Sequence, residues 1–124
     1  MQVNVIPGDI TQTTENVDAI VSLRRSNGMW GGVGQAIYCR YGTCYHLNLE
    51  AQLGDSKPFD GQIFIVKCEN DINLSFKNIM FIFDCLALPL KTLVFNILSA
   101  AQELNYQRIA IPSMRTGNSL GFFC

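Results

Sequence analysis

The chain has 124 residues, with nine Lys and Arg against ten Asp and Glu and a formal net charge of −1. This length predicts a single domain over residues 1–124, large enough to bury a hydrophobic core without disulfides or metals. With 48% hydrophobic and 15% charged residues, the composition excludes a disordered chain. The balanced charge gives no electrostatic reason to expect binding to duplex DNA.

The sequence also indicates where the protein resides. Its apolar runs, such as residues 79–83, are too short to span a bilayer, and no signal peptide precedes them. Five cysteines without a CxxC pair, beside a single histidine, do not make a convincing zinc site. We therefore expect a cytoplasmic protein with no metal, no cofactor and no membrane contact, whose cysteines are mostly buried, with one or two exposed thiols.

The hydrophobic pattern predicts strands and helices in alternation. The clearest helix is residues 90–104, where apolar residues recur at spacings of three and four. Residues 62–68 contain four consecutive apolar residues, which is typical of a strand covered on both faces. In chain order we expect strands over 2–6 and 17–21, helical segments over 33–41 and 44–53, strands over 62–68 and 79–83, the helix over 90–104, and a strand over 108–111.

Such alternation predicts an α/β sandwich around a largely parallel or mixed sheet. Ligands of these folds bind beyond the carboxyl ends of the strands. Two segments that contain glycine, residues 22–34 and 113–121, leave predicted strands and would lie at that edge. They are the candidate ligand-binding loops.

Three features of the sequence suggest chemistry, and each has a purely structural alternative. Asp9 follows the first predicted strand, where it either accepts a hydrogen bond from a ligand amine or caps the turn that follows. The glycines at 31, 32 and 34 precede an apolar helix, whose free amides and positive N-terminus suit a diphosphate. The structural alternative is a flexible loop that is followed by a helix and binds nothing. Arg115 is either a phosphate contact or a solvated surface residue.

The aromatic residues leave similar alternatives open. Trp30 either rims a pocket or anchors its loop to the core. The tyrosines at 38, 41 and 45, with His46, are interpreted as the flank of a helix rather than a catalytic cluster.

Four motifs occur in a recognisable order. They are Gly8-Asp9-Ile10-Thr11, Asp18-Ala19-Ile20-Val21, Gly31-Gly32-Val33-Gly34, and Ile109-Ala110-Ile111-Pro112 ahead of Thr116-Gly117. Together they resemble the macrodomain family, whose members bind ADP-ribose. The resemblance implies a three-layer α/β/α sandwich with a mixed central sheet.

The resemblance also implies a ligand site. Asp9 and the amide of Ile10 would hold the adenine, the two glycine loops the diphosphate, and Phe122 would pack against the distal ribose. The residues expected to bind the ligand are Asp9, Ile10, Asn27, Gly31, Gly32, Val33, Gly34, Arg115, Thr116, Gly117, Asn118, Ser119 and Phe122.

The catalytic residues of the family's hydrolases are not matched. Arg25 replaces the asparagine that orients the distal ribose, unless Asn27 substitutes for it, and Gly34 stands where many hydrolases have an aspartate. A second, glycohydrolase branch uses a lysine and an aspartate. Asp84 or Cys85 stands at the position of that lysine, and Ser119 stands at the position of that aspartate. Lys67, on the neighbouring predicted strand, is only a distant candidate for the lysine. The catalytic residues are therefore unknown.

We expect a module that binds ADP-ribose or a related nucleotide, free or linked to protein. The alternatives are an ADP-ribosyl hydrolase or deacylase with an unusual residue set, and a degenerate macrodomain that serves as a protein-interaction surface. The family continues beyond the second glycine loop with a helix and a strand that this sequence does not contain, so we also expect an exposed sheet edge that invites self-association.

Overall fold

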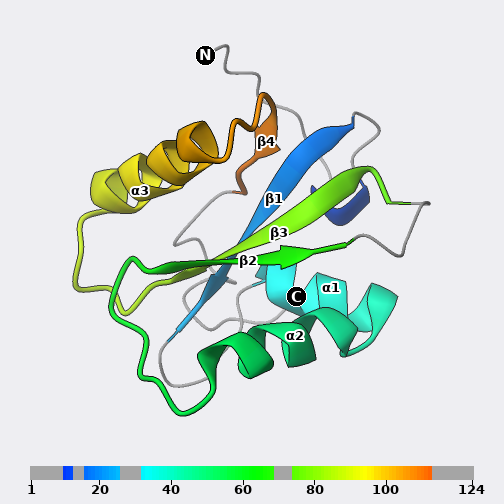
Figure 1. Cartoon of the computed structure of the whole chain (residues 1–124), viewed down its shortest axis with the longest axis horizontal. Helices are drawn as coiled ribbons and strands as arrows, with labels where there is room; N and C mark the ends of the chain where they lie inside the picture. The colour runs from blue at the N-terminus through cyan, green and yellow to red at the C-terminus, as the bar shows by residue number, and fades with distance from the viewer. Residues whose placement is uncertain (1–9, 13–15, 26–31, 69–73, 113–124) are drawn as a thin grey trace.

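A computed structural model of the chain describes residues 10–12, 16–25, 32–68 and 74–112. These residues form a sheet and three α-helices (Figure 1). The elements in chain order are the 3-10 helix η1 (Ile10–Gln12), β1 (Val17–Arg24), α1 (Gly32–Tyr41), α2 (Cys44–Leu53), β2 (Ile63–Lys67), β3 (Phe76–Phe83), α3 (Leu90–Glu103) and β4 (Ile109–Ala110).

The sheet is mixed, with the strand order β2-β3-β1-β4. β1 runs parallel to both of its neighbours, and β2 runs antiparallel to β3. The two central strands are apolar over most of their length and almost wholly buried, as expected for strands with helices on both faces. The expectation of a mixed central sheet is thus confirmed.

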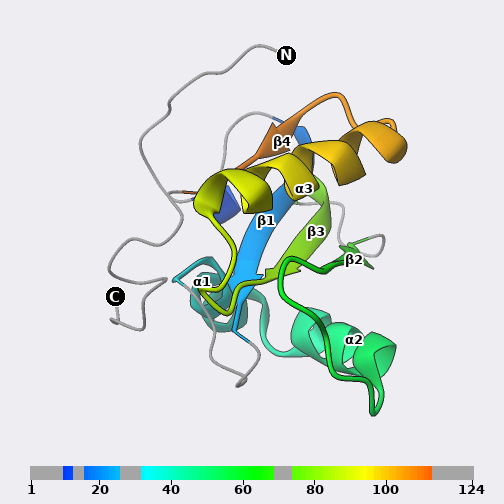
Figure 2. The same cartoon turned by 90° about the vertical axis from the view of Figure 1, so that its left-hand side faces the viewer.

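Helices cover the sheet on both faces. α3 lies on one face, and α1 and α2 lie on the other, so the described part of the chain forms three layers (Figure 2). The core is divided accordingly. One cluster, centred on Ile20, Ile37 and Phe81, lies on the side of α1 and α2. The second, centred on Val21, Ile82 and Leu93, lies on the side of α3.

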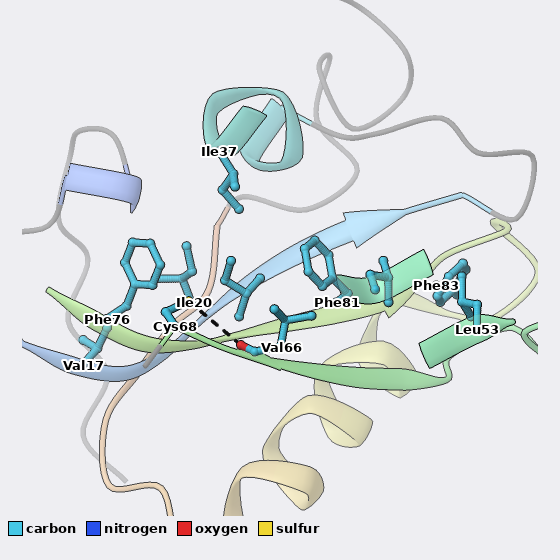
Figure 3. Packing of buried hydrophobic residues seen from close by; sticks show 11 residues of the cluster. Val17, Ile20, Ile37, Leu53, Val66, Cys68, Phe76, Phe81 and Phe83 are labelled. Carbon is cyan, nitrogen blue, oxygen red and sulfur yellow. Dashed lines mark hydrogen bonds between the residues drawn. The ribbon is translucent and has the colours of Figure 1, made fainter. Parts of the chain in front are cut away.

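Alternation along the strands sends neighbouring residues into the two clusters. On the α1 and α2 side, Ile37 points from α1 toward Phe81 and its neighbours on the sheet (Figure 3). On the other side, α3 buries Leu93, Ile97 and Ala101, which recur at the helical spacing that the sequence predicted. The predictions of all three helices are therefore confirmed to within one residue at each end.

The strands differ more from expectation. β1 extends three residues beyond the predicted 17–21, and β3 begins three residues before the predicted 79–83, because the pair of parallel strands continues over the polar residues at their ends. β4 has only two residues. The strand predicted over residues 2–6 lies outside the described residues.

β2 was predicted to be covered on both faces, and its side chains do contact both clusters. However, it is an edge strand, so Ile63, Phe64 and Ile65 remain half-buried. Gln52 of α2 covers part of this edge by donating a hydrogen bond to the carbonyl of Ile65, at 2.8 Å.

The cysteines are more exposed than expected. Of the four described, only Cys68 is buried, whereas Cys39, Cys44 and Cys85 are exposed. Over the described ranges, no group of three or more His, Cys, Asp or Glu side chains has the arrangement of a metal site. None of the helices in those ranges is long and apolar enough to cross a membrane.

Candidate functional site

The carboxyl ends of β1 and β3 lie side by side. Arg24 is paired with Phe83 in the strand register, and the amide of Asp84 donates to the carbonyl of Arg24 at 2.8 Å. β4 runs in the same direction, so three parallel strands point toward one edge of the sheet. This is the edge at which open α/β sheets bind ligands.

The first turn of α1 carries the glycines that were predicted to hold a diphosphate. Gly32 and Val33 are half-buried, and Gly34 is buried. No acidic residue occupies this turn, so its positive end is not neutralised from within the helix. The first amides of a helix lack intrahelical partners and are available to donate hydrogen bonds to an anion.

η1 lies against α1 on the same face of the sheet. Ile10 and Val33 both pack on the cluster beneath α1 and α2. The hydroxyl of Tyr41, in the last turn of α1, donates to the carbonyl of Thr11 at 3.2 Å. The two described parts of the predicted site are therefore arranged along the length of α1, which is about 15 Å for ten residues.

Two arginines follow each other at the end of β1. Arg24 forms an ion pair with Glu50 of α2, and its guanidinium lies over the ring of Phe83, 5.5 Å from the centroid. Arg25 is half-buried and directly follows the strand. Glu50 thus balances the charge of Arg24, and Arg25 adds a second guanidinium at the end of β1.

His46, interpreted as part of the flank of a helix, lies on the side of α2 that faces the sheet. Its side chain is 8% exposed and points into the layer between α2 and the sheet. The ring stacks on Tyr38 at 6.2 Å between centroids and lies 6.1 Å from Phe81. The spacing of His46, Leu49 and Leu53, which are the buried residues of α2, was the sequence signal for this orientation.

The surroundings of His46 set its charge. Burial, assisted by the nearby guanidinium of Arg24, lowers the pKa of the imidazole from its ordinary value of 6.5. A hydrogen bond to the backbone of Gly34 and the charge of Glu50 oppose this shift only in part. The ring is therefore neutral near pH 7.

Asp84, which directly follows β3, holds the chain after that strand. It is 2% exposed, and its Oδ1 accepts the amide of Leu86 at 2.9 Å, where the backbone has a φ of 65°. Asp60 holds the same segment by accepting the amides of Cys85 and Leu88. Both carboxylates thus stabilise backbone turns.

Lys67 lies far from this edge. Because β2 is antiparallel to β3, Lys67 pairs with Asn78 near the start of β3, at the opposite end of the sheet from Asp84. Lys67, the distant candidate, therefore lies away from the edge at which the ligand is expected.

Of the thirteen predicted ligand residues, Ile10, Gly32, Val33 and Gly34 are described, and all four lie on the α1 side of the sheet. The remaining nine lie outside the described residues: Asp9, Asn27, Gly31, Arg115, Thr116, Gly117, Asn118, Ser119 and Phe122. Trp30 lies outside them as well.

This architecture is similar to that of a solved structure, the macrodomain of DarG from Mycobacterium tuberculosis. The similarity has a TM-score of 0.66 and covers 91% of this chain and 76% of the other. The chain has the macrodomain fold. Sequence identity over the match is only 18%, so the similarity establishes the fold and not the activity. No family model and no curated protein matches the sequence. The three-layer α/β/α arrangement implied by the four motifs is thereby confirmed.

Proposed function

We propose that this macrodomain fold binds ADP-ribose, free or linked to protein, with the diphosphate at the first turn of α1. The observation that carries the proposal is the glycine-bearing N-terminus of α1, which has no acidic residue in its first turn and lies on a macrodomain fold. A helix N-terminus attracts phosphate through its free amides and its partial positive charge. Arg25, at the end of β1, adds positive charge to the same region.

The adenine end of the ligand would lie near η1. The amide of Ile10 and the carboxylate of Asp9 are its proposed partners, as in the family that the sequence resembles. η1 and the glycines occupy different places along α1, on one face of the sheet. ADP-ribose carries the diphosphate that AMP lacks, so we expect the chain to prefer ADP-ribose to AMP.

Binding is favoured over hydrolysis. Cleaving a glycosidic bond needs a group that activates water or holds the distal ribose for attack. Asp84 is buried and engaged in a turn, and arginine at position 25 replaces an amide side chain. We therefore expect turnover of ADP-ribosylated protein to be weak or absent, and fast turnover would favour the hydrolase alternative.

A pair of variants at Gly32 tests the diphosphate site. Gly32→Gln and Gly32→Glu add side chains of nearly equal size, but only the second adds negative charge. Glutamate in the first turn of a helix stabilises the helix, so the charged variant should fold. We expect Gly32→Glu to weaken ADP-ribose binding at least tenfold more than Gly32→Gln, because like charges repel at the phosphate.

Isothermal titration with ADP-ribose and with AMP gives the measurement, and circular dichroism confirms that both variants fold. A micromolar Kd, equivalent to about −8 kcal/mol, is a reasonable affinity for the wild-type chain. Failure of the wild-type chain to bind ADP-ribose, or equal affinity for AMP, would overturn the proposal. If neither substitution changes the affinity for ADP-ribose, the phosphates bind at another place on the protein.

A further inference from the structure

The outer edge of β2 is a surface that the proposed ligand site does not use. Within the part of the chain that the structure describes, β2 has a strand neighbour on one side only, which is β3 (Figure 1). The backbone amides and carbonyls on the outer side of an edge strand can pair with a strand from another molecule. The edge is therefore a template for association.

The hydrogen bonds between β2 and β3 show which residues of β2 face outward. The carbonyl of Gln62 accepts from the amide of Phe83 at 3.0 Å. At the other end, the amide of Cys68 donates to the carbonyl of Lys77 at 2.9 Å. Because the backbone groups of antiparallel strands point toward the neighbour at every second residue, the odd positions between Gln62 and Cys68 point away from β3. These positions are Ile63, Ile65 and Lys67.

Gln52 of α2 closes part of this edge. Its Nε2 donates to the outward carbonyl of Ile65 at 2.8 Å and to Oδ1 of Asn48 at 3.0 Å. Both protons of the side-chain amide are thus used, and Asn48, one turn earlier on the same helix, orients the group. The Gln52 side chain therefore lies on the side from which a further strand would approach β2.

A second copy of this chain fits the edge, because two identical antiparallel strands are related by a two-fold axis and form a closed dimer. With the axis at Ile65, this residue faces its own counterpart, and Ile63 faces Lys67 of the second copy. Lys67 is the only charged residue of β2, so no like charges face each other in this register. Ile63 and Ile65 are half-buried and pack beside α3, so pairing would cover more of their apolar surface.

We propose that the outer edge of β2 pairs with β2 of a second copy, and that Gln52 limits this pairing by occupying the carbonyl of Ile65. In the dimer, that carbonyl accepts the amide of Ile65 of the second copy, so each copy must first release the bond from Gln52. Association is therefore weak in the wild-type chain and stronger when Gln52 is removed. The proposal does not depend on ADP-ribose binding.

Truncation of Gln52 tests its role. Gln52→Ala removes the bond to Ile65, and Gln102→Ala, at an exposed glutamine near the end of α3, is the matched control. Sedimentation equilibrium of the full chain without ligand measures the Kd of the dimer. We expect this Kd to be at least about tenfold lower in Gln52→Ala than in the wild-type chain, because neither copy then has a hydrogen bond to release. Gln102→Ala should match the wild-type chain.

Two charge substitutions in the Gln52→Ala background test the register. Ile63→Lys places a lysine opposite Lys67 of the second copy at both ends of the strand pair, and the repulsion should raise the dimer Kd about tenfold. Adding Lys67→Glu places opposite charges face to face and should restore the Kd toward that of Gln52→Ala. Circular dichroism verifies that each variant is folded.

Equal dimer Kd values for the wild-type chain and Gln52→Ala overturn the role of Gln52. A Gln52→Ala dimer that tolerates Ile63→Lys, or that Lys67→Glu does not restore, overturns the pairing of β2 and indicates association through another surface. A chain that stays monomeric in every variant overturns both parts of the proposal. None of these outcomes bears on the proposed function, which is tested by the ADP-ribose titrations alone.

Discussion

Asp18 is the first residue of the strand motif Asp18-Ala19-Ile20-Val21, and its charged side chain has a structural task. Its Oδ2 accepts the amides of Gln107 and Arg108, at 2.7 and 3.0 Å, just before β4. The bond from Arg108 in particular lowers the pKa of the carboxyl from 3.8, with a smaller contribution from Lys77, against the effect of partial burial. The carboxylate thus joins the start of β4 to β1.

We expect Asp18→Asn to lower the free energy of unfolding by about 1 kcal/mol at pH 7, since a neutral acceptor replaces a charged one at a partly exposed site. The native pKa lies below 3.8, so the contribution of Asp18 is complete above that pH and is lost as the pH falls below it. The difference in the free energy of unfolding between the wild-type chain and Asp18→Asn should therefore become smaller below about pH 4. Urea unfolding between pH 7 and 3 measures it. Asp55→Asn, at an exposed loop carboxylate, serves as the control.

At the scale of elements, the junction at Gly61 holds β2, β3 and α3 together. Its amide donates to the carbonyl of Phe83 at 2.7 Å, and its own carbonyl accepts from Asn96 of α3 at 3.3 Å. Gly61 has a φ of 83°, in the left-handed region that favours glycine. A Cβ placed there would lie 2.8 Å from Nδ2 of Asn96 and 2.9 Å from Cδ1 of Leu88.

Alanine substitution separates backbone strain from crowding. Gly42, between α1 and α2, has a similar φ of 77° but open space around a Cβ. We expect Gly42→Ala to cost about 1 kcal/mol of stability from backbone strain alone. Gly61→Ala should cost about 2–4 kcal/mol, because Asn96 and Leu88 must also move. Chemical denaturation of both variants measures the costs, and equal losses would show that the junction is not tightly packed.

At the scale of the whole molecule, the buried His46 and the half-buried Tyr106 limit the pH range of stability. The pKa of His46 is lowered from 6.5 by burial and by Arg24, with Glu50 opposing and Tyr38 stacked on the ring. The pKa of Tyr106 is raised from 10.0 by burial and by the charge of Asp18. The unfolded chain therefore binds a proton at position 46 more readily than the native chain, and loses one at position 106 more readily.

The free energy of unfolding should accordingly be greatest between about pH 6.5 and 10 and should fall on either side. On the acid side, His46→Phe should flatten the decline that begins below pH 6.5. On the alkaline side, Tyr106→Phe should flatten the decline above pH 10. Thermal unfolding from pH 5 to 11 tests both. A decline on the acid side that is identical in His46→Phe would show that another group is responsible.

The sequence by itself determined the helices, the alternation of strands with helices and the glycine-rich start of α1. These features depend on local periodicity and backbone stereochemistry, which a short stretch such as Leu90–Glu103 contains in full. It also carried the four ordered motifs from which the macrodomain fold was inferred, and the structural similarity confirms that inference.

Only the tertiary structure decided which polar residues lie together. The antiparallel direction of β2 carries Lys67 to the edge of the sheet opposite Asp84, and the packing of α2 on the sheet buries His46 beside Gly34. Asp18 meets the amide of Arg108 across 90 positions of the chain. Each of these contacts depends on strand order, strand direction and the face that a helix buries. Those properties arise from the packing of distant segments, and no single segment of the sequence specifies them.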